Sequence, residues 1–255
     1  MKKNLPAKLI TEIISALLFP VFLITFISLL CFWDLILKLS PQSILDKIVR
    51  YFNYTIYSSL KLICTSYKVE GKVPEVWSGP CIIISNHQSM FDMPWLYSVF
   101  NKFNPRYVAK IELSKNIPGI SICLKKGGSA LIDRKNSNQA INEIQSLAKR
   151  MRKHQYSAII FPEGTRARDG ELKKFKMAGL KELVKNLGET KLIPVAIDNS
   201  WILMTRKYGP IPGFCRLKMR IGEPIEVNQG SDVEMAIKES FDVVKGLLEE
   251  IRLEG

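Results

Sequence analysis

The stretch CIIISNHQSMFD, residues 81–92, carries the strongest indication of how this chain folds. It begins with the unbroken apolar run Cys81–Ser85, directly after Gly79-Pro80, and a short run of this kind predicts a buried strand. The polar residues from Asn86 onward place a loop at the end of that strand. Ligands in open α/β sheets usually bind beyond the ends of strands, so functional residues are sought first in this loop.

The chain around this stretch has the pattern of an α/β domain. From residue 68 onward, short apolar runs alternate with amphipathic stretches, and we expect a mixed, mostly parallel sheet flanked by helices. Further strands are predicted at 107–109, 129–132, 157–161, 192–197 and 217–221. Helices are predicted at 89–100, 136–153 and 232–253, and a basic loop at 166–176.

The N-terminal part of the chain has a different character. Residues from Ile13 to Trp33 carry no charge, and as a helix this run spans about 31 Å, enough for the hydrocarbon core of a bilayer. The run is too long for a signal peptide, which leaves a buried soluble helix as the alternative. Pro20 predicts a kink. From Ile48 to Cys64, apolar residues recur at every fourth position, which is typical of an amphipathic helix.

These two segments predict a membrane anchor. We expect residues 1–66 to form membrane-anchoring helices and residues 67–255 to form the α/β domain. Basic residues flank the apolar run on both sides, so the positive-inside rule does not orient it. A two-helix element embedded in the membrane is favoured over a single span.

Composition narrows the function classes. The net charge is +13, and residues 101–220 hold 25 Lys and Arg against 9 Asp and Glu, which favours contact with polyanions or anionic lipid. Without a zinc-finger spacing, an aromatic RNA-binding run or a basic heptad, nucleic acid is not the expected partner. The five cysteines have no CxxC spacing and only two histidines exist, so we expect no metal and a reducing cytoplasmic setting.

One histidine and one aspartate form the first candidate site. His87 follows the predicted strand, and Asp92 lies five residues later. On one continuous helix these side chains would point about 140° apart, so they can meet only if His87 lies in the loop and Asp92 in the first turn of the next helix. Asp92 would then accept the Nδ1 proton and leave Nε2 as a base. The alternative is a loop histidine held by a helix-start aspartate.

A second group, FPEGTR at 161–166, also follows a predicted strand. A tight turn at Gly164 would present Glu163 and Arg166 together. Arg166 beside the hydroxyl of Thr165 suits phosphate, and Glu163 suits glycerol hydroxyls. Such turns are common, so an ordinary surface turn remains the alternative.

Two more cations lie near the ends of predicted strands. Arg134 closes the stretch GSALIDR at 128–134, and Lys110 closes the stretch around 107–109. Both are candidate phosphate ligands, although Arg134 can instead pair with Asp133. No G-x-S-x-G motif is present, so the His87 pair suits direct activation of a substrate hydroxyl and not a serine nucleophile.

Together these stretches resemble the lysophospholipid and glycerophosphate acyltransferase family. The resemblance rests on four blocks in order: NHQSMFD at 86–92, GSALIDR at 128–134, FPEGTR at 161–166 and IPVAI at 193–197. It covers roughly residues 65 to 225. It implies that His87 is the catalytic base and that Asp92 orients it.

The resemblance also implies a substrate site. Glu163 with Gly164, and Arg134 with Arg166, would bind the glycerol-phosphate acceptor, and Pro194 would lie near the acyl donor. The remaining predicted substrate-binding residues are Lys110, Gly128 and Thr165.

The reaction that this implies moves an acyl group from acyl-CoA or acyl-carrier protein to the free sn-2 hydroxyl of lysophosphatidic acid, giving phosphatidic acid, with no cofactor. We expect a membrane-bound enzyme whose site faces the cytoplasm, at the inner membrane if the source is bacterial. Alternatives are another lysophospholipid or glycerol 3-phosphate as acceptor, and a non-enzymatic protein that binds the membrane surface.

Overall fold

The computed structural model describes residues 5–74, 79–206 and 210–254. Within them, eight strands form one sheet in the order β1-β7-β6-β2-β5-β3-β4, with β8 also beside β6. The strands are β1 (Ser66–Glu70), β2 (Cys81–Ser85), β3 (Arg106–Lys110), β4 (Ala130–Ile132), β5 (Ala158–Ile160), β6 (Thr190–Asp198), β7 (Arg216–Ile221) and β8 (Ile225–Val227). Only the pairs β6–β7 and β6–β8 are antiparallel, which confirms the mixed, mostly parallel sheet.

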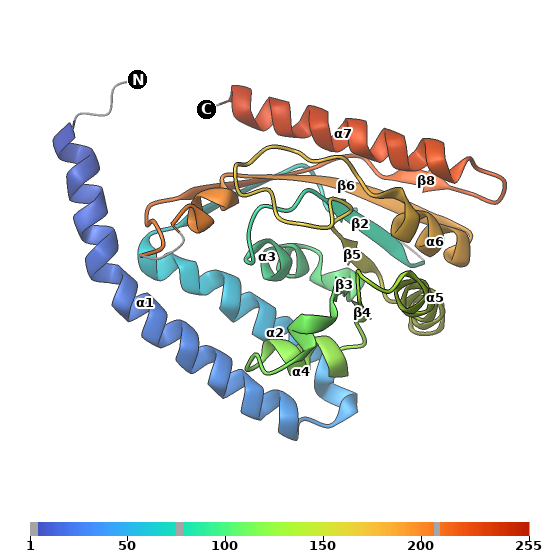
Figure 1. Ribbon diagram of the computed structural model, residues 1–255, viewed down its shortest axis with the longest axis horizontal. Helices are drawn as coiled ribbons and strands as arrows, with labels where there is room; N and C mark the ends of the chain where they lie inside the picture. The colour runs from blue at the N-terminus through green and yellow to red at the C-terminus, as the bar shows by residue number, and fades with distance from the viewer. Residues whose placement is uncertain (1–4, 75–78, 207–209, 255) are drawn as a thin grey trace.

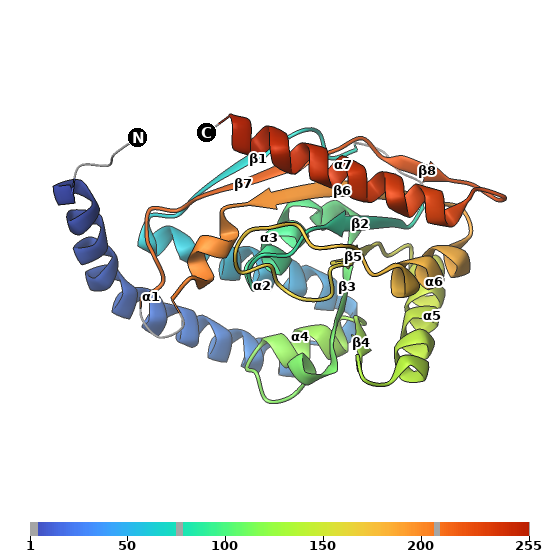
Figure 2. The same ribbon diagram turned by 45° about the horizontal axis from the view of Figure 1, so that its top comes forward.

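Helices cover both faces of the sheet. They are α1 (Leu5–Leu39), α2 (Leu45–Ser58), α3 (Asp92–Val99), α4 (Ile120–Lys126), α5 (Ser137–His154), α6 (Met177–Leu187) and α7 (Val233–Leu253). Helices α5, α6 and α7 lie on one face, and α1 to α4 lie on the other (Figures 1 and 2). The predicted strands and helices are confirmed, but β1, β8, α4 and α6 were not predicted.

The central strand β2 belongs to both hydrophobic cores. All five of its residues are buried, and it is paired with β5 on one side and β6 on the other. Side chains alternate between the faces of a strand, so Ile82 and Ile84 pack against α5 to α7 while Ile83 packs on the side of α1 to α4. Burying one such side chain stabilises the fold by roughly 2 kcal/mol. This explains why an unbroken apolar run predicted the strand.

Parallel pairing collects the carboxyl ends of five strands at one edge of the sheet. Strands β4, β3, β5, β2 and β6 all run in the same direction. The loops that leave them therefore begin side by side, although they are far apart in the sequence. The predicted functional stretches after β2, β3, β4 and β5 all begin at this edge.

Pro194 lies inside β6 at a place where its missing N–H does little harm. Residues 190–192 pair with β8, and residues 195–198 pair with β7. Pro194 lies in the gap between these two antiparallel ladders, and its carbonyl accepts the N–H of Gly222 at 2.9 Å.

Helix α1 confirms the predicted apolar helix and is longer than the uncharged run. It continues without a break through Pro20 and follows a curved course (Figure 1). On its inner side, the rings of Phe22 and Phe26 pack against Phe91. Residues Leu9–Leu39 are long and apolar enough to cross a membrane. Its outer side exposes Leu9, Ile10, Ile13, Leu17, Val21, Ile24, Ile27, Phe32, Leu35 and Leu39.

The carboxyl end of α1 is fastened to α4. Lys126 Nζ donates to the carbonyl oxygens of Leu37 at 2.8 Å and Ser40 at 2.9 Å. Asp34 accepts the N–H of Gly119 at 2.9 Å, one residue before α4 begins. The last carbonyls of a helix lack partners within the helix, so a lysine from outside satisfies them.

Helix α2 confirms the amphipathic helix predicted there. Its apolar face, which includes Phe52 and Ile56, is buried against α1 and α3. Arg106 on β3 is only 2% exposed and bonds to Asp46 Oδ1 at 2.5 Å, which joins α2 to the sheet. The assignment of residues 1–66 to a separate anchoring region stays a prediction.

Replacing Lys126 by Met removes the positive charge and all donors from the end of α1 while keeping an unbranched side chain. We expect the free energy of unfolding to fall by about 1–3 kcal/mol, because the carbonyl groups at the helix end lose their partner. Thermal unfolding in detergent measures this. The neighbouring Lys125 is exposed, and Lys125→Met should leave the melting temperature unchanged. Equal melting temperatures for both variants would contradict the role assigned to Lys126.

Candidate active site

His87 and Asp92 meet at a corner between a strand and a helix. His87 lies in the loop after β2, and Asp92 is the first residue of α3. His87 Nδ1 lies 2.9 Å from Asp92 Oδ2. The geometry that the five-residue spacing required is therefore present.

The Asp92 carboxylate is wholly buried and fully bonded. Besides the imidazole, Oδ2 accepts the N–H groups of Gln88 at 2.6 Å and Ser89 at 2.7 Å. Oδ1 accepts the hydroxyls of Ser89 at 3.1 Å and Ser200 at 2.6 Å. An ionised carboxylate only accepts hydrogen bonds, so it selects the imidazole tautomer with the proton on Nδ1. Nε2 is then left as an acceptor.

Both sides of the His87 backbone are also held. Its N–H donates to Glu163 Oε1 at 2.7 Å, and its carbonyl accepts the N–H of Ala167 at 2.7 Å. The imidazole stacks on the ring of Phe161, with centroids 4.1 Å apart. The segment after β5 therefore holds the loop after β2 in place through these contacts with His87.

Asn86 extends this anchoring to β6. Its side-chain amide donates to the carbonyl of Ile197 at 2.8 Å and accepts the N–H of the same residue at 2.7 Å. This two-point contact continues the strand pairing for one residue beyond β2.

Glu163 lies beneath the site and not in it. It is 2% exposed, and its second oxygen accepts the N–H of Lys173 at 3.1 Å. Burial raises the pKa of its carboxyl to about 7, while the hydrogen bonds from the N–H groups of His87 and Lys173 act in the opposite direction. The side chain joins the His87 loop to the basic loop. Its predicted hydrogen bonds to glycerol hydroxyls stay a prediction, and in the structure each carboxyl oxygen accepts a backbone N–H.

A cavity of about 560 Å³ opens beside His87. Its polar lining comes from the strand ends and the loop after β5, and its apolar lining comes from α1, α2, α4 and the turn after β3. The predicted residues that line it are His87, Lys110, Arg134, Thr165 and Arg166. The apolar residues include Phe26, Phe52, Ile56, Tyr107, Leu113, Ile117, Ile120 and Leu124.

Arg168 also lines the cavity, and sequence reasoning missed it. It lies within the predicted basic loop, two residues after Arg166, so its charge was the only available signal. Among the described residues, Lys110, Arg134, Arg166 and Arg168 form no salt bridge with Asp or Glu, and Glu112 acts on Arg134 only at longer range. Four unneutralised cations thus surround one cavity.

Four predicted substrate-binding residues do not line the cavity. Gly164 (φ +71°) and Gly128 (φ +76°) have backbone conformations that favour glycine: Gly164 lies in the loop that carries Arg166, and Gly128 lies in the turn between α4 and β4. Pro194 lies inside β6, away from the strand ends. Glu163, described above, is the fourth residue outside the cavity lining.

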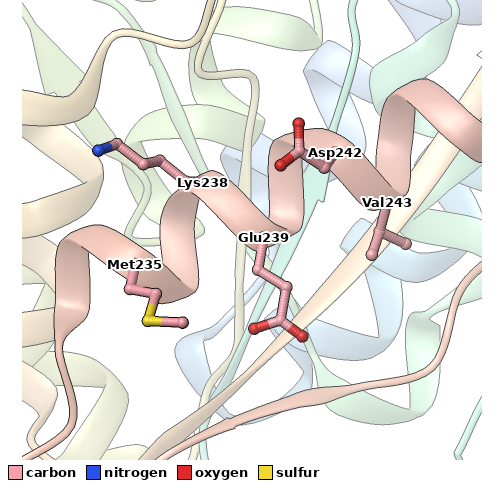
Figure 3. A pocket seen from close by; sticks show the side chains of 5 residues that line it. All are labelled: Met235, Lys238, Glu239, Asp242 and Val243. Atoms are coloured by element: carbon pink, nitrogen blue, oxygen red, sulfur yellow. The ribbon is translucent and has the colours of Figure 1, made fainter.

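A second hollow in the described structure lacks the features of a catalytic site. A hollow of about 390 Å³ on the outer side of α7 is lined by Met235, Lys238, Glu239, Asp242 and Val243, all from one helix (Figure 3). It has no histidine and lies away from the strand ends. Within the described residues, no group of three His, Cys, Asp or Glu side chains could hold a metal ion.

The cavity suits a particular class of ligand. Its cationic and apolar walls fit a molecule that has both an anionic part and a hydrocarbon part. His87 lines the same cavity as these cationic and apolar side chains, and a base held by a buried aspartate at that position favours an enzyme.

A comparison with protein families also indicates an enzyme. A family model described as "Acyltransferase" matches residues 66–198, more than half of the chain, and the chain therefore belongs to the acyltransferase family. Curated relatives include the 1-acyl-sn-glycerol-3-phosphate acyltransferase of Saccharomyces cerevisiae, 29% identical over 57% of this chain and 47% of the relative. The human beta enzyme of the same name is 34% identical over 47% of this chain and 42% of the relative. The chain spans about half the length of the curated relatives it matches.

A solved structure matches over nearly the whole chain. The 1-acyl-sn-glycerophosphate acyltransferase from Thermotoga maritima superposes with a TM-score of 0.69 at 25% identity, covering 95% of this chain and 97% of that one. The similarity includes the region of α1 and α2 as well as the α/β domain.

The buried Glu163 makes stability depend on pH. Its folded-state pKa of about 7 lies above its usual 4.5, so the folded protein keeps a proton that the unfolded chain releases. This contribution is fully present below about pH 4.5 and is lost as the pH rises through about 7. We expect the free energy of unfolding to decrease over that range, and Glu163→Gln to lack this part of the decrease. Chemical unfolding in detergent at several pH values measures both, and identical pH dependence in the two proteins would contradict it.

Proposed function

We propose that this protein transfers an acyl group from acyl-CoA or acyl-carrier protein to the sn-2 hydroxyl of lysophosphatidic acid, with His87 as general base. The observation that carries the proposal is that His87, bonded to the buried Asp92, lines a cavity whose other lining residues are cationic and apolar. The names of the relatives support the same acceptor.

In the proposed step, His87 Nε2 removes the proton of the acceptor hydroxyl as its oxygen attacks the thioester carbonyl. The new C–O bond forms, the C–S bond breaks, and the thiolate receives the proton from the imidazolium. Asp92 holds the tautomer and stabilises the imidazolium. Base catalysis of this kind contributes roughly 10²–10⁴-fold.

A covalent acyl-enzyme is not required by this scheme. Ser85 and Ser89 are the serines nearest in sequence to the histidine; the Ser85 hydroxyl donates to the Asn86 carbonyl, and the Ser89 hydroxyl donates to Asp92 and accepts the N–H of Phe91 at 3.1 Å. Both serines are wholly buried and are used to build the fold. The absence of a G-x-S-x-G motif supports the same conclusion.

The cations are proposed to bind the acceptor phosphate. Lys110 at the end of β3, Arg134 after β4, and Arg166 and Arg168 after β5 line the same cavity as His87. Their positive charges repel one another, and a phosphomonoester dianion relieves that repulsion. A phosphate held there directs the glycerol hydroxyls toward the histidine.

The apolar wall and α1 are proposed to serve the lipid part. Phe26 of α1 and Phe52 and Ile56 of α2 line the cavity, which offers a hydrocarbon chain a surface away from water. The exposed apolar side of α1 supports a place in a membrane. We further propose that the site faces the cytoplasm. Both substrates of such an enzyme carry long acyl chains, so residence at the bilayer brings them to the cavity.

Removing the imidazole tests the proposed base. We expect His87→Ala to lower kcat for acyl transfer to lysophosphatidic acid by about 10²–10⁴-fold, because the substitution removes the nitrogen that accepts the hydroxyl proton. The only other histidine, His154, is exposed at the end of α5, and His154→Ala should retain full activity. Phospholipid product is measured by mass, and vesicle flotation should be the same for all three proteins. Full activity in His87→Ala would refute the mechanism.

Removing one cation tests the proposed phosphate site. Arg168→Gln should raise KM for lysophosphatidic acid roughly tenfold with little change in kcat, because a charged hydrogen bond to the acceptor is lost. Lys174→Gln, an exposed residue of the same loop outside the cavity, is the matched control. Glycerol 3-phosphate and an uncharged monoacylglycerol are offered in parallel. An equal effect on the uncharged acceptor would show that Arg168 does not bind phosphate.

A further inference from the structure

The strongest single contact to the His87–Asp92 pair from another part of the chain comes from Ser200. Its hydroxyl donates to Asp92 Oδ1 at 2.6 Å, and the serine is wholly buried. A hydroxyl at this distance from a carboxylate is a charge-assisted hydrogen bond, about twice as strong as a neutral one. Ser200 lies 108 residues after Asp92 and belongs to none of the four sequence blocks.

The other donors to Asp92 are local. The N–H groups of Gln88 and Ser89, the Ser89 hydroxyl and the His87 ring all belong to the same loop as the carboxylate. Among the described residues, Ser200 is the one that bonds the carboxylate directly to the segment after β6, and it does so through the oxygen that does not touch the imidazole. It therefore opposes rotation of the carboxylate about its Cβ–Cγ bond.

The backbone around Ser200 is shaped for this contact. Strand β6 ends at Asp198, and Asn199 has a left-handed conformation (φ +67°) that turns the chain into a short 3-10 helix beginning at Ser200. Asparagine tolerates this conformation better than most residues. The turn brings the hydroxyl back to the same edge of the sheet at which His87 lies.

Gln88 locks that turn in place. Its side-chain oxygen accepts the N–H groups of Ser200 at 3.1 Å and Trp201 at 3.3 Å. Its side-chain nitrogen donates to Asp198 Oδ1 and to the Gly170 carbonyl, both at 3.3 Å. The Ser200 hydroxyl also lies 3.3 Å from the Gln88 side-chain oxygen, but its contact with Asp92 Oδ1 is much shorter at 2.6 Å and is made to a carboxylate, so Asp92 is the stronger acceptor of the hydroxyl proton.

We propose that Ser200 is a positioning residue of the His87–Asp92 pair: its hydroxyl fixes the Asp92 carboxylate so that the imidazole keeps its tautomer and direction. The proposal rests on the function proposed above, in which His87 is the base. Ser200 acts through Asp92 and touches neither substrate. Its loss should therefore slow the chemical step and leave substrate binding intact.

Kinetics of Ser200 variants test this. We expect Ser200→Ala to lower kcat about tenfold while KM for both substrates stays within about twofold. Ser200→Thr keeps the hydroxyl and should recover most of kcat. Ser200→Cys is nearly the same size and has only a weak S–H donor, so it should fold and yet remain slow. Ser240→Ala in α7 is the matched control, because Ser240 is also wholly buried and its hydroxyl donates to the Ala236 carbonyl at 2.9 Å.

A second measurement separates positioning from general structural support. In an Asp92→Asn background, followed with excess enzyme, Ser200→Ala should change the rate by less than about twofold, because the carboxylate on which it acts is gone. A full tenfold further loss there would overturn the proposal. Wild-type rates in Ser200→Cys, or a folded Ser200→Thr as slow as Ser200→Ala, would also overturn it.

The outcomes also separate this inference from the proposed function. If the wild-type protein transfers no acyl group to any lysophospholipid, the proposed function fails. If the wild-type protein is active, His87→Ala is inactive and Ser200→Ala is as fast as wild type, only the inference about Ser200 fails.

Discussion

The rest of the site depends on one constraint: the buried Asp92 carboxylate must have hydrogen-bond donors in place of water. A carboxylate with no contact with water is very unfavourable unless hydrogen bonds replace its hydration. Asp92 has five donors, and meeting them fixes the path of the loop after β2, the first turn of α3 and the turn after β6. Glu163 holds the other side of the same loop through the N–H of His87. The direction of the imidazole follows from these two buried carboxyl groups.

The features of this site that the sequence could predict are those that depend on local patterns. An unbroken apolar run, a histidine after it and an aspartate five residues later are local patterns, and their spacing alone required the corner that is present. Helices α4 and α6 are short and lie between stronger signals, and the edge strand β1 is largely exposed, so its sequence lacks an apolar run. The burial of Glu163 and the contact from Ser200 depend on neighbours that only the folded sheet brings together. No local pattern can indicate such contacts.

The cationic residues also show the difference between what a local sequence pattern predicts and what the fold decides. Their charges predicted an anionic ligand, and the ends of the parallel strands bring Lys110, Arg134 and Arg166 to one cavity. Glu163 and Gly164, which lie in the same sequence block as Arg166, instead shape the loop that carries it. Neighbours in a motif can therefore have unlike roles, one meeting a ligand and the next holding the backbone. Residue type alone does not distinguish them.

Helix α1 has a consequence for how this protein can be handled. Phe26 forms part of the cavity wall, and Phe22 and Phe26 support Phe91 within the loop that carries His87. The apolar helix is therefore also a piece of the site. A chain shortened to begin after residue 40 would gain solubility and at the same time lose one wall of its cavity. In the proposed reaction, water would then reach the thioester of the acyl donor, and hydrolysis would compete with transfer. An intact site and a water-soluble protein cannot both be obtained by removing this helix.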